Sequence, residues 1–240
     1  AYHKDGHDHL KVVGETAFVA DVAQAASSSP EKAQIAGIIS HADLRSPDLS
    51  EMLDAHEQAG KGLFRGIRQA GARDFDDALI IPGRAPENLY ADEAFLRGIT
   101  ELGKRGLTYD TWQYHHQLPA LIALARAVPD TTIILDHLST PLGVGGYEGK
   151  RDAIFARWTY DMAELAQYPN VHLKLGGFAM PDNGWGYLAQ DTPASSDQML
   201  EDQGPWYTHA LDLFGADRCM FESNFPVDRA SVSYPVLWNF

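Results

Sequence analysis

The sequence predicts an α/β protein of the (β/α)8 barrel class, and three observations support this. Short apolar runs alternate along the chain with longer stretches of helical periodicity, which is typical of parallel βαβ units. Polar and ionisable residues directly follow the predicted strands, where a barrel builds its active site. No G-x-G-x-x-G sequence occurs, although an open doubly wound sheet usually carries one after an early strand.

Six strands are predicted from runs of apolar and β-branched residues. They cover residues 34–40, 63–67, 107–112, 131–137, 170–177 and 218–224. The intervening helices have apolar residues at three- and four-residue spacing. They cover residues 14–26, 46–60, 91–106, 118–128, 151–167 and roughly 197–214. A complete barrel has eight strands, so we expect residues 1–240 to form a single, incomplete barrel domain in which residues 1–13 are a polar N-terminal loop.

Composition and charge exclude several classes of protein. A formal net charge of −14 argues against nucleic acid and anionic membrane surfaces as partners, because both demand basic patches. The longest apolar runs are about eight residues, well below the ~20 that a membrane helix needs. The single cysteine, Cys219, favours a reducing compartment, so a cytoplasmic location is expected. The expected partner is a small molecule, and a homo-oligomer is left open.

Four motifs occur in order at the ends of the later strands. They are "YHHQLP" (114–119), "LDHLSTP" (135–141), "KLGGF" (174–178) and "FESNFPVD" (221–228). In this order they resemble the amidohydrolase-related superfamily of (β/α)8 metal-dependent hydrolases, in the branch that includes sugar-acid lactonases. The resemblance covers residues from about 14 to 240, and implies that the chain lacks the family's first two strands and final helix.

The resemblance also implies a metal site. It assigns His115 and His137 to the family's metal-binding histidines after the fifth and sixth strands, and implies a divalent cofactor, with zinc the expected ion. Such a cation polarises a carbonyl and lowers the pKa of bound water. The chain departs from the family pattern at Asn224, where Asp is usual, and the first-strand H-x-H pair is not present. A metal-independent enzyme is therefore an alternative, in which His115 is a loop or capping residue.

Alternation along the last strand predicts the catalytic groups. Glu222 and Asn224 share one face, and Lys174 lies on the preceding strand. A buried charge is not tolerated without a partner, so we expect Lys174 and Glu222 to form an ion pair inside the barrel. Glu222 is then the candidate base, Asn224 a hydrogen-bonding group and Lys174 the third catalytic residue. The Asp136 side chain is expected to point to the other face of its strand from the neighbouring His137, and to orient a helix or a loop.

Three further residues are candidates for substrate binding. Arg68 and His41 follow predicted strands, and Trp185 lies in the loop after residues 170–177. Arg68 can bind a carboxylate in bidentate fashion, although pairing with acidic surface residues is an equal alternative. Trp185 can cover a pocket or serve a subunit interface.

The predicted function is hydrolysis of a lactone, or of a related cyclic ester or amide, in a small polar or acidic substrate by an activated water. Three alternatives stay open. The same scaffold can support a decarboxylase. Lys174 can act as the Schiff-base nucleophile of an aldolase-type enzyme. The chain can also be a catalytically inactive barrel used for binding.

Overall fold

The computed structural model describes residues 2–29, 31–81, 83 and 85–240. The chain forms two compact units. The first consists of Ala1–Gln69, Asp92–Asp110 and Asp130–Thr132, and the second of Ala70–Ala91, Thr111–Pro129 and Ile133–Phe240. The single barrel domain expected from the sequence stays a prediction, and each unit is described by itself.

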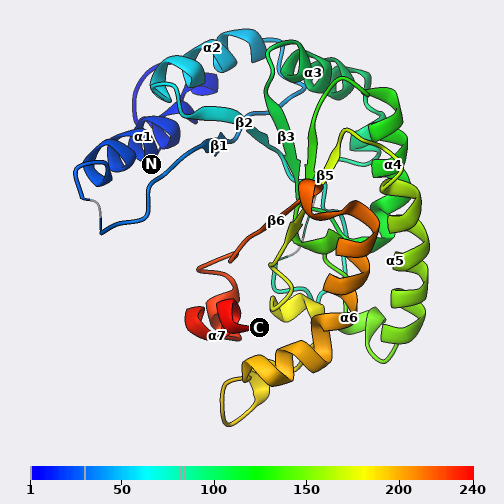
Figure 1. Cartoon of the computed structure of the whole chain (residues 1–240). Helices are drawn as coiled ribbons and strands as arrows, with labels where there is room; N and C mark the ends of the chain where they lie inside the picture. The colour runs from blue at the N-terminus through cyan, green and yellow to red at the C-terminus, as the bar shows by residue number, and fades with distance from the viewer. Residues whose placement is uncertain (1, 30, 82, 84) are drawn as a thin grey trace. The chain divides into compact units, whose positions relative to one another are not determined.

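The first unit contains three parallel strands and three α-helices. The strands are β1 (Ile38–Ser40), β2 (Phe64–Arg68) and β3 (Thr108–Thr111), the last residue of which falls in the second unit. The helices are α1 (Val13–Ala26), α2 (Leu49–Ala59) and α3 (Glu93–Lys104). β2 pairs with β1 and with β3, and α1 packs against α2 and β1, as Figure 1 shows.

The core of the first unit follows from amphipathic helices packed on the strands. Leu53, Phe95, Ile99 and Leu102 are fully buried, as is Ile67 of β2. Burial of each such side chain contributes roughly 1.5–3 kcal/mol. The helix α3 begins where the Asp92 side chain accepts a hydrogen bond from the Phe95 amide at 2.9 Å, which is an N-cap.

In the described residues, the second unit contains the other three strands and four α-helices. The strands are β4 (Ile133–Leu135), β5 (Val171–Leu175) and β6 (Cys219–Phe221). The helices are α4 (Leu118–Ala127), α5 (Arg151–Leu165), α6 (Ser196–Phe214) and α7 (Tyr234–Asn239). β5 pairs in parallel with β4 and with β6, and α5 packs against α4 and α6 (Figure 1).

Local sequence explains where these helices begin. The Ser195 side chain accepts a hydrogen bond from the Gln198 amide at the start of α6, and the Ser233 side chain does the same for Val236 in α7.

Trp158 of α5 is fully buried, and the centroid of its ring lies 4.9 Å from that of Trp206 on α6. Aromatic contacts of this kind join the two helices.

The predicted order of elements is confirmed in the described residues. All six strands occur where they were expected, although most are shorter than predicted. The predicted polar N-terminal loop contains a 3-10 helix, η1 (Asp8–Leu10), and α1 begins at Val13. The helix α7 was missed, because six residues are too few to show helical periodicity.

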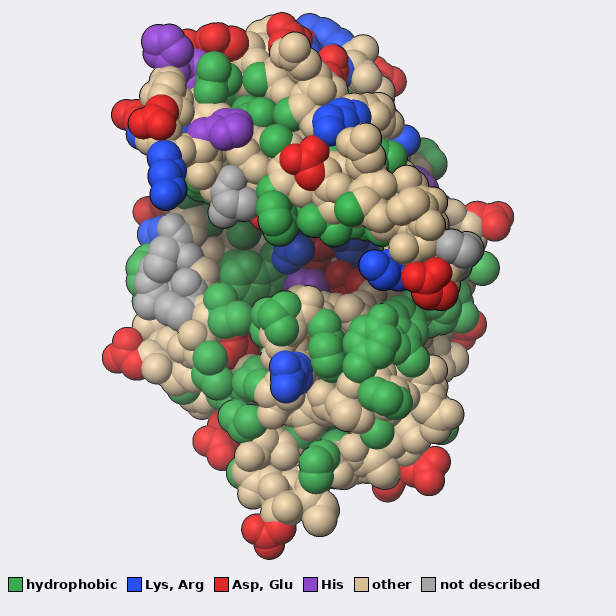
Figure 2. Space-filling model, turned by 90° about the vertical axis from the view of Figure 1, so that its left-hand side faces the viewer, with side chains coloured by type: hydrophobic (Ala, Val, Ile, Leu, Met, Phe, Trp, Pro, Cys, Tyr) green, Lys and Arg blue, Asp and Glu red, His purple; other side chains and the backbone are tan. Residues whose placement is uncertain are grey.

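Several apolar side chains near the C-terminus of the second unit are exposed. Phe221 is 74% exposed, and Met220, Tyr234 and Trp238 are exposed as well. Figure 2 shows a broad area of hydrophobic side chains in its lower half. Large apolar areas are unusual on isolated monomers. Within the described residues, no helix is both long and apolar enough to cross a membrane.

Candidate active site

The carboxyl ends of β4, β5 and β6 carry the ionisable residues of the second unit. Asp136 and His137 follow β4, Lys174 is the fourth residue of β5, and Glu222 directly follows β6. Neighbouring parallel strands end at the same edge of their sheet. Four sequence-predicted site residues therefore lie at or just beyond these strand ends: Lys174, Glu222, Asn224 and His137.

A left-handed turn places His137. Residues 137 to 140 have positive φ angles of 57°, 52°, 61° and 40°. Residues other than glycine rarely adopt this conformation, and it persists only where the surroundings hold it. The Trp158 indole donates to the Leu138 carbonyl at 2.9 Å, and the Trp112 indole donates to the Thr140 hydroxyl at 2.9 Å. The turn ends the alternation of side chains between the two faces of the strand, so alternation no longer predicts where side chains point after Asp136.

His137 and Glu222 form a buried hydrogen-bonded pair. Oε1 of Glu222 lies 2.6 Å from Nδ1 of His137 and accepts from the His137 backbone amide at 3.0 Å. The side chains are 3% and 13% exposed. In a neutral imidazole, a proton on Nδ1 leaves the lone pair on Nε2. Glu222 therefore orients His137 rather than standing alone as a base.

Two consecutive glycines make room for this pair. A Cβ on Gly177, whose φ is +66°, would lie 2.1 Å from Nδ1 of His137. A Cβ on Gly176 would lie 2.1 Å from the Glu222 carbonyl oxygen. Both positions require the absence of a side chain. The "KLGGF" motif thus shapes the space that His137 and Glu222 occupy.

The predicted ion pair between Lys174 and Glu222 is wrong. Lys174 Nζ lies 2.8 Å from Oδ1 of Asp136, which is fully buried, while Glu222 bonds to His137. The register explains the difference, because Lys174 is level with Met220 and Glu222 therefore lies two residues nearer the end of the sheet. Asp136, which was expected to orient a helix or a loop, is the ion-pair partner that Lys174 needs.

A buried carboxylate that the sequence analysis missed lies beside Asn224. Asp228 is fully buried, and its Oδ1 accepts from Nδ2 of Asn224 at 2.8 Å. Burial raises the pKa of Asp228 to about 6, against the lowering effects of the Asn224 bond and the His137 charge. The signal available in the sequence was the four-residue spacing in "NFPVD".

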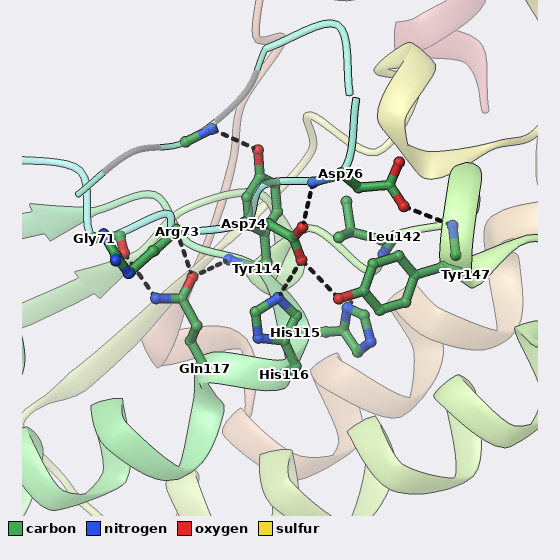
Figure 3. Close-up of polar contacts among 12 residues, drawn as sticks. Gly71, Arg73, Asp74, Asp76, Tyr114, His115, His116, Gln117, Leu142 and Tyr147 are labelled. Carbon is green, nitrogen blue, oxygen red and sulfur yellow. Dashed lines mark hydrogen bonds and ion pairs between the residues drawn. The ribbon is translucent and has the colours of Figure 1, made fainter. Parts of the chain in front are cut away.

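His115 and His116 belong to a different polar network, which Figure 3 shows. Both lie in a 3-10 helix, η3 (His115–Gln117), where strand alternation does not apply. Nε2 of His116 lies 3.0 Å from Oδ2 of Asp74, and the Tyr147 hydroxyl donates to the same oxygen at 2.7 Å. His116, which the sequence analysis did not select, is thus a partner of a carboxylate.

His115 is buried and, within the described residues, forms no hydrogen bond with a carboxylate. Its Nδ1 accepts from the Leu142 amide at 3.2 Å. Burial lowers the pKa of His115 to about 4, so the ring is neutral at pH 7. A neutral ring is the form that a metal requires, although His115 lines a loop network rather than the His137 and Glu222 pair.

The metal prediction is not supported by the donor set in this part of the chain. The described residues contain no group of three or more His, Cys, Asp or Glu side chains that could hold a metal ion. Nδ1 of His137 and Nδ1 of His115 are both engaged by other groups. The assignment of these histidines as metal ligands stays a prediction.

The candidate substrate-binding residues lie in two places. Arg68 and His41 belong to the first unit, where Nδ1 of His41 lies 3.0 Å from the Arg68 carbonyl oxygen. Trp185 belongs to the second unit, and the Arg151 guanidinium lies 3.6 Å from its ring centroid. One face of the Trp185 ring is therefore covered. The binding roles of Arg68, His41 and Trp185 stay predictions.

Trp185 lines a cavity of about 570 Å³ in the second unit. The loops that follow β4 and β5 supply most of its wall, including Tyr147, Arg151 and Tyr187. Nη2 of Arg151 donates to the Asn183 carbonyl at 2.8 Å, which holds the second loop in place. A cavity of this size accommodates a small polar molecule.

Comparison with known proteins identifies the family. The sequence model of the Amidohydrolase family matches residues 1–240. The chain belongs to this amidohydrolase family. An uncharacterized protein from Sinorhizobium fredii is 35% identical to this amidohydrolase over 247 residues, which is 100% of this chain and 71% of that protein. The predicted family and the predicted class of enzyme, a hydrolase of the amidohydrolase type, are confirmed.

Two further comparisons concern Burkholderia multivorans. An L-fucono-1,5-lactonase from this organism is 30% identical over 223 residues, covering 92% of this chain and 65% of the lactonase. A crystal structure of an amidohydrolase from the same organism with bound zinc has a TM-score of 0.73 and 27% identity, covering 94% of this chain and 69% of that one. The α/β fold class of the amidohydrolase barrels is confirmed. The chain spans about two thirds of the length of these relatives.

Proposed function

We propose that this amidohydrolase opens the lactone ring of a small sugar acid by attack of water on the lactone carbonyl. The observation that carries the proposal is the buried contact of 2.6 Å between His137 and Glu222 at the ends of β4 and β6. The name of the relative from Burkholderia multivorans, L-fucono-1,5-lactonase, supports a sugar lactone as substrate class.

The pair of His137 and Glu222 is suited to moving a proton. Glu222 accepts a hydrogen bond from Nδ1–H of His137. The lone pair on Nε2 of His137 can therefore take a proton from the attacking water. A bond forms between the water oxygen and the carbonyl carbon, and the bond from that carbon to the ring oxygen breaks. The proton then passes to the ring oxygen, and the product is an open-chain hydroxy acid.

Lys174 and Asn224 complete the proposed constellation. Lys174, whose ammonium is held 2.8 Å from Asp136, supplies positive charge for the carbonyl oxygen as negative charge develops there. Asn224 is half-buried and forms a hydrogen bond with the attacking water. The binding of an acidic group by Arg68, which belongs to the first unit, stays a separate prediction.

Zinc is the metal to test, because it is bound in the similar amidohydrolase from Burkholderia multivorans. A bound divalent cation would polarise the carbonyl and lower the pKa of water. His137 and His115 are the residues whose ring nitrogens could contribute. Elemental analysis of the purified protein, with turnover measured after chelation and after zinc is restored, decides whether the reaction needs it.

The alternative that uses Lys174 as a Schiff-base nucleophile is opposed by its ion pair. A nucleophilic lysine must lose its proton, whereas a carboxylate at 2.8 Å stabilises the ammonium form. Borohydride reduction with a carbonyl substrate tests this directly. A cytoplasmic location and self-association stay predictions.

The proposed function is tested with a panel of aldonolactones in a pH-stat assay. We expect the wild-type protein to hydrolyse at least one 1,4- or 1,5-lactone faster than the spontaneous rate, and Glu222→Gln and His137→Asn to lose that activity together. Hydrolysis that is unchanged in both variants would exclude the pair from the reaction. No turnover of any lactone by folded wild-type protein would exclude the proposed function.

A further inference from the structure

Asp228 is a fully buried carboxylate close to the proposed site that the reaction as described does not use. It begins a 3-10 helix, η9 (Asp228–Ala230), after β6. Its Oδ1 accepts from Nδ2 of Asn224 at 2.8 Å, and its Oδ2 accepts from the Ala179 amide at 3.3 Å. Two hydrogen-bond donors therefore converge on one carboxylate.

The backbone brings Asp228 and Asn224 together. The Val227 amide donates to the Asn224 carbonyl at 2.9 Å, and the Asp228 amide donates to the same oxygen at 3.3 Å. Asn224 itself has a φ of 50°, a conformation that Asn tolerates better than most residues. This turn brings the two side chains into contact, with Asp228 fully buried and Asn224 half-buried.

A purely structural role explains this arrangement poorly. Burying a carboxylate costs free energy, and a neutral acceptor would satisfy the Ala179 amide. The charged groups that act on Asp228 from neighbouring elements are Glu222 after β6 and His137 after β4, and Asp228 in turn acts on the partly buried Tyr207 of α6. Burial raises the pKa of Asp228 to about 6, because it disfavours the charged form of this carboxylate.

We propose that Asp228 is a positioning residue, which holds the Asn224 amide with Nδ2 inward so that Oδ1 faces outward as the acceptor for the attacking water. The inference rests on the proposed function, in which Asn224 binds that water. An amide has one donor end and one acceptor end, so fixing Nδ2 also fixes Oδ1. Asp228 can hold Nδ2 because a carboxylate only accepts hydrogen bonds.

Hydrogen-bond chemistry predicts which substitutions break this arrangement. In Asp228→Asn, one acceptor oxygen must serve two donors, so either the Ala179 amide loses its partner or the Asn224 amide turns over. In the exchange variant Asn224→Asp with Asp228→Asn, the new amide accepts from Ala179 and donates to the new carboxylate. That variant satisfies every donor and again presents an acceptor oxygen at position 224.

The kinetic test compares these variants on the lactone that the wild-type protein turns over. We expect kcat of folded Asp228→Asn to fall roughly 10- to 100-fold with a smaller change in KM, as is typical when a supporting hydrogen bond is lost. We expect kcat of the exchange variant to be roughly tenfold higher than that of Asp228→Asn. The control is Asp212→Asn on the exposed face of α6, which should leave kcat unchanged.

A spectroscopic readout is independent of turnover. The chain has five asparagines, so labelling with ¹⁵N-asparagine gives few side-chain amide signals, and Asn224→Asp identifies the one from Asn224. We expect this signal to shift between pH 4 and 8 and to lose that shift in Asp228→Asn. The amide of Asn170, held by the Ala125 and Val128 carbonyls, is the internal reference.

Two results would overturn the proposal. One is an Asn224 amide that responds to pH no more than Asn170 does. The other is a folded Asp228→Asn protein whose kcat stays within about twofold of the wild type, well below the change that loss of a supporting bond produces. If no lactone is hydrolysed by the wild type while the amide still follows Asp228, the proposed function fails and the coupling of the two side chains stands.

Discussion

The second unit contains two pairs of histidine and carboxylate that look alike in distance but differ in setting. Nδ1 of His137 lies 2.6 Å from Glu222, and Nε2 of His116 lies 3.0 Å from Asp74. The His137 side chain is 3% exposed, whereas the His116 side chain is 35% exposed. The first pair joins the ends of two strands, and the second joins η3 to a loop (Figure 3).

The partners of the two carboxylates explain the difference in role. Glu222 accepts only from His137 in the hydrogen bonds of the described chain, through the ring and the backbone amide. Asp74 accepts from Tyr147, from the Asp76 amide and from His116. Burial by itself would raise the pKa of Asp74, but these contacts together hold it below its ordinary value. Asp74, with three donors from different segments, holds loops together. Glu222, with His137 as its one partner residue in the described chain, orients a single imidazole ring.

The largest expected effect separates the two pairs by activity. Glu222→Gln keeps the shape of the side chain but removes the charge that orients His137, so we expect kcat on a lactone to fall ~10²- to 10⁴-fold. Asp74→Asn should change kcat by less than about threefold, because loop ties act mainly on stability. Steady-state kinetics on both variants measures this. Equal losses in the two would remove the distinction.

The second effect concerns the space around His137. Gly177→Ala would force a Cβ into the ring at a φ of +66°, and we expect the free energy of unfolding to fall by about 2–4 kcal/mol, with activity lost as the ring moves. Gly149→Ala is the matched control. Its φ is +70°, but no atom lies within 4 Å of the added Cβ, so only the conformational cost of about 1–2 kcal/mol applies. Urea unfolding of the two variants measures both losses of stability. Equal losses would show that the His137 ring moves aside without a further cost in free energy.

The third effect uses His115, a buried histidine in the loop network. Its pKa is about 4 in the folded chain and ordinarily 6.5, so the unfolded chain binds more protons between these values. Stability should therefore fall as pH drops from 6.5 to 4, by roughly 2–3 kcal/mol from this ring. His115→Gln should flatten the dependence in urea unfolding at several pH values. Asp228, whose pKa is raised to about 6, acts in the opposite direction and stays present in both proteins.

The smallest effect tests whether the Asp74 network is structural. Tyr147→Phe removes one hydrogen bond to Asp74, and we expect a loss of about 1 kcal/mol in stability with kcat nearly unchanged. Thermal unfolding and lactone kinetics measure both quantities. A large loss of turnover without a loss of stability would place this network in the reaction.

Local pattern was enough to predict the elements of the fold. Apolar periodicity identified all six strands and the six longer helices, because these patterns depend only on neighbouring residues. The position of polar residues after the strands correctly selected Glu222 and His137 as neighbours of a strand end. Where alternation was extended beyond the strands it failed, since the left-handed turn at residues 137–140 is held by Trp112 and Trp158 from other elements.

By itself, the sequence determined the order of strands and helices, the family and the kinds of side chain available at the strand ends. Only the tertiary structure decided which of those side chains meet. Lys174 meets Asp136 rather than Glu222 because Lys174 is level with Met220, two residues before Glu222, and Asn224 meets Asp228 because a turn closes between them. The physical reason is that composition and periodicity depend on residues close along the chain, whereas pairing depends on register, which long-range packing sets.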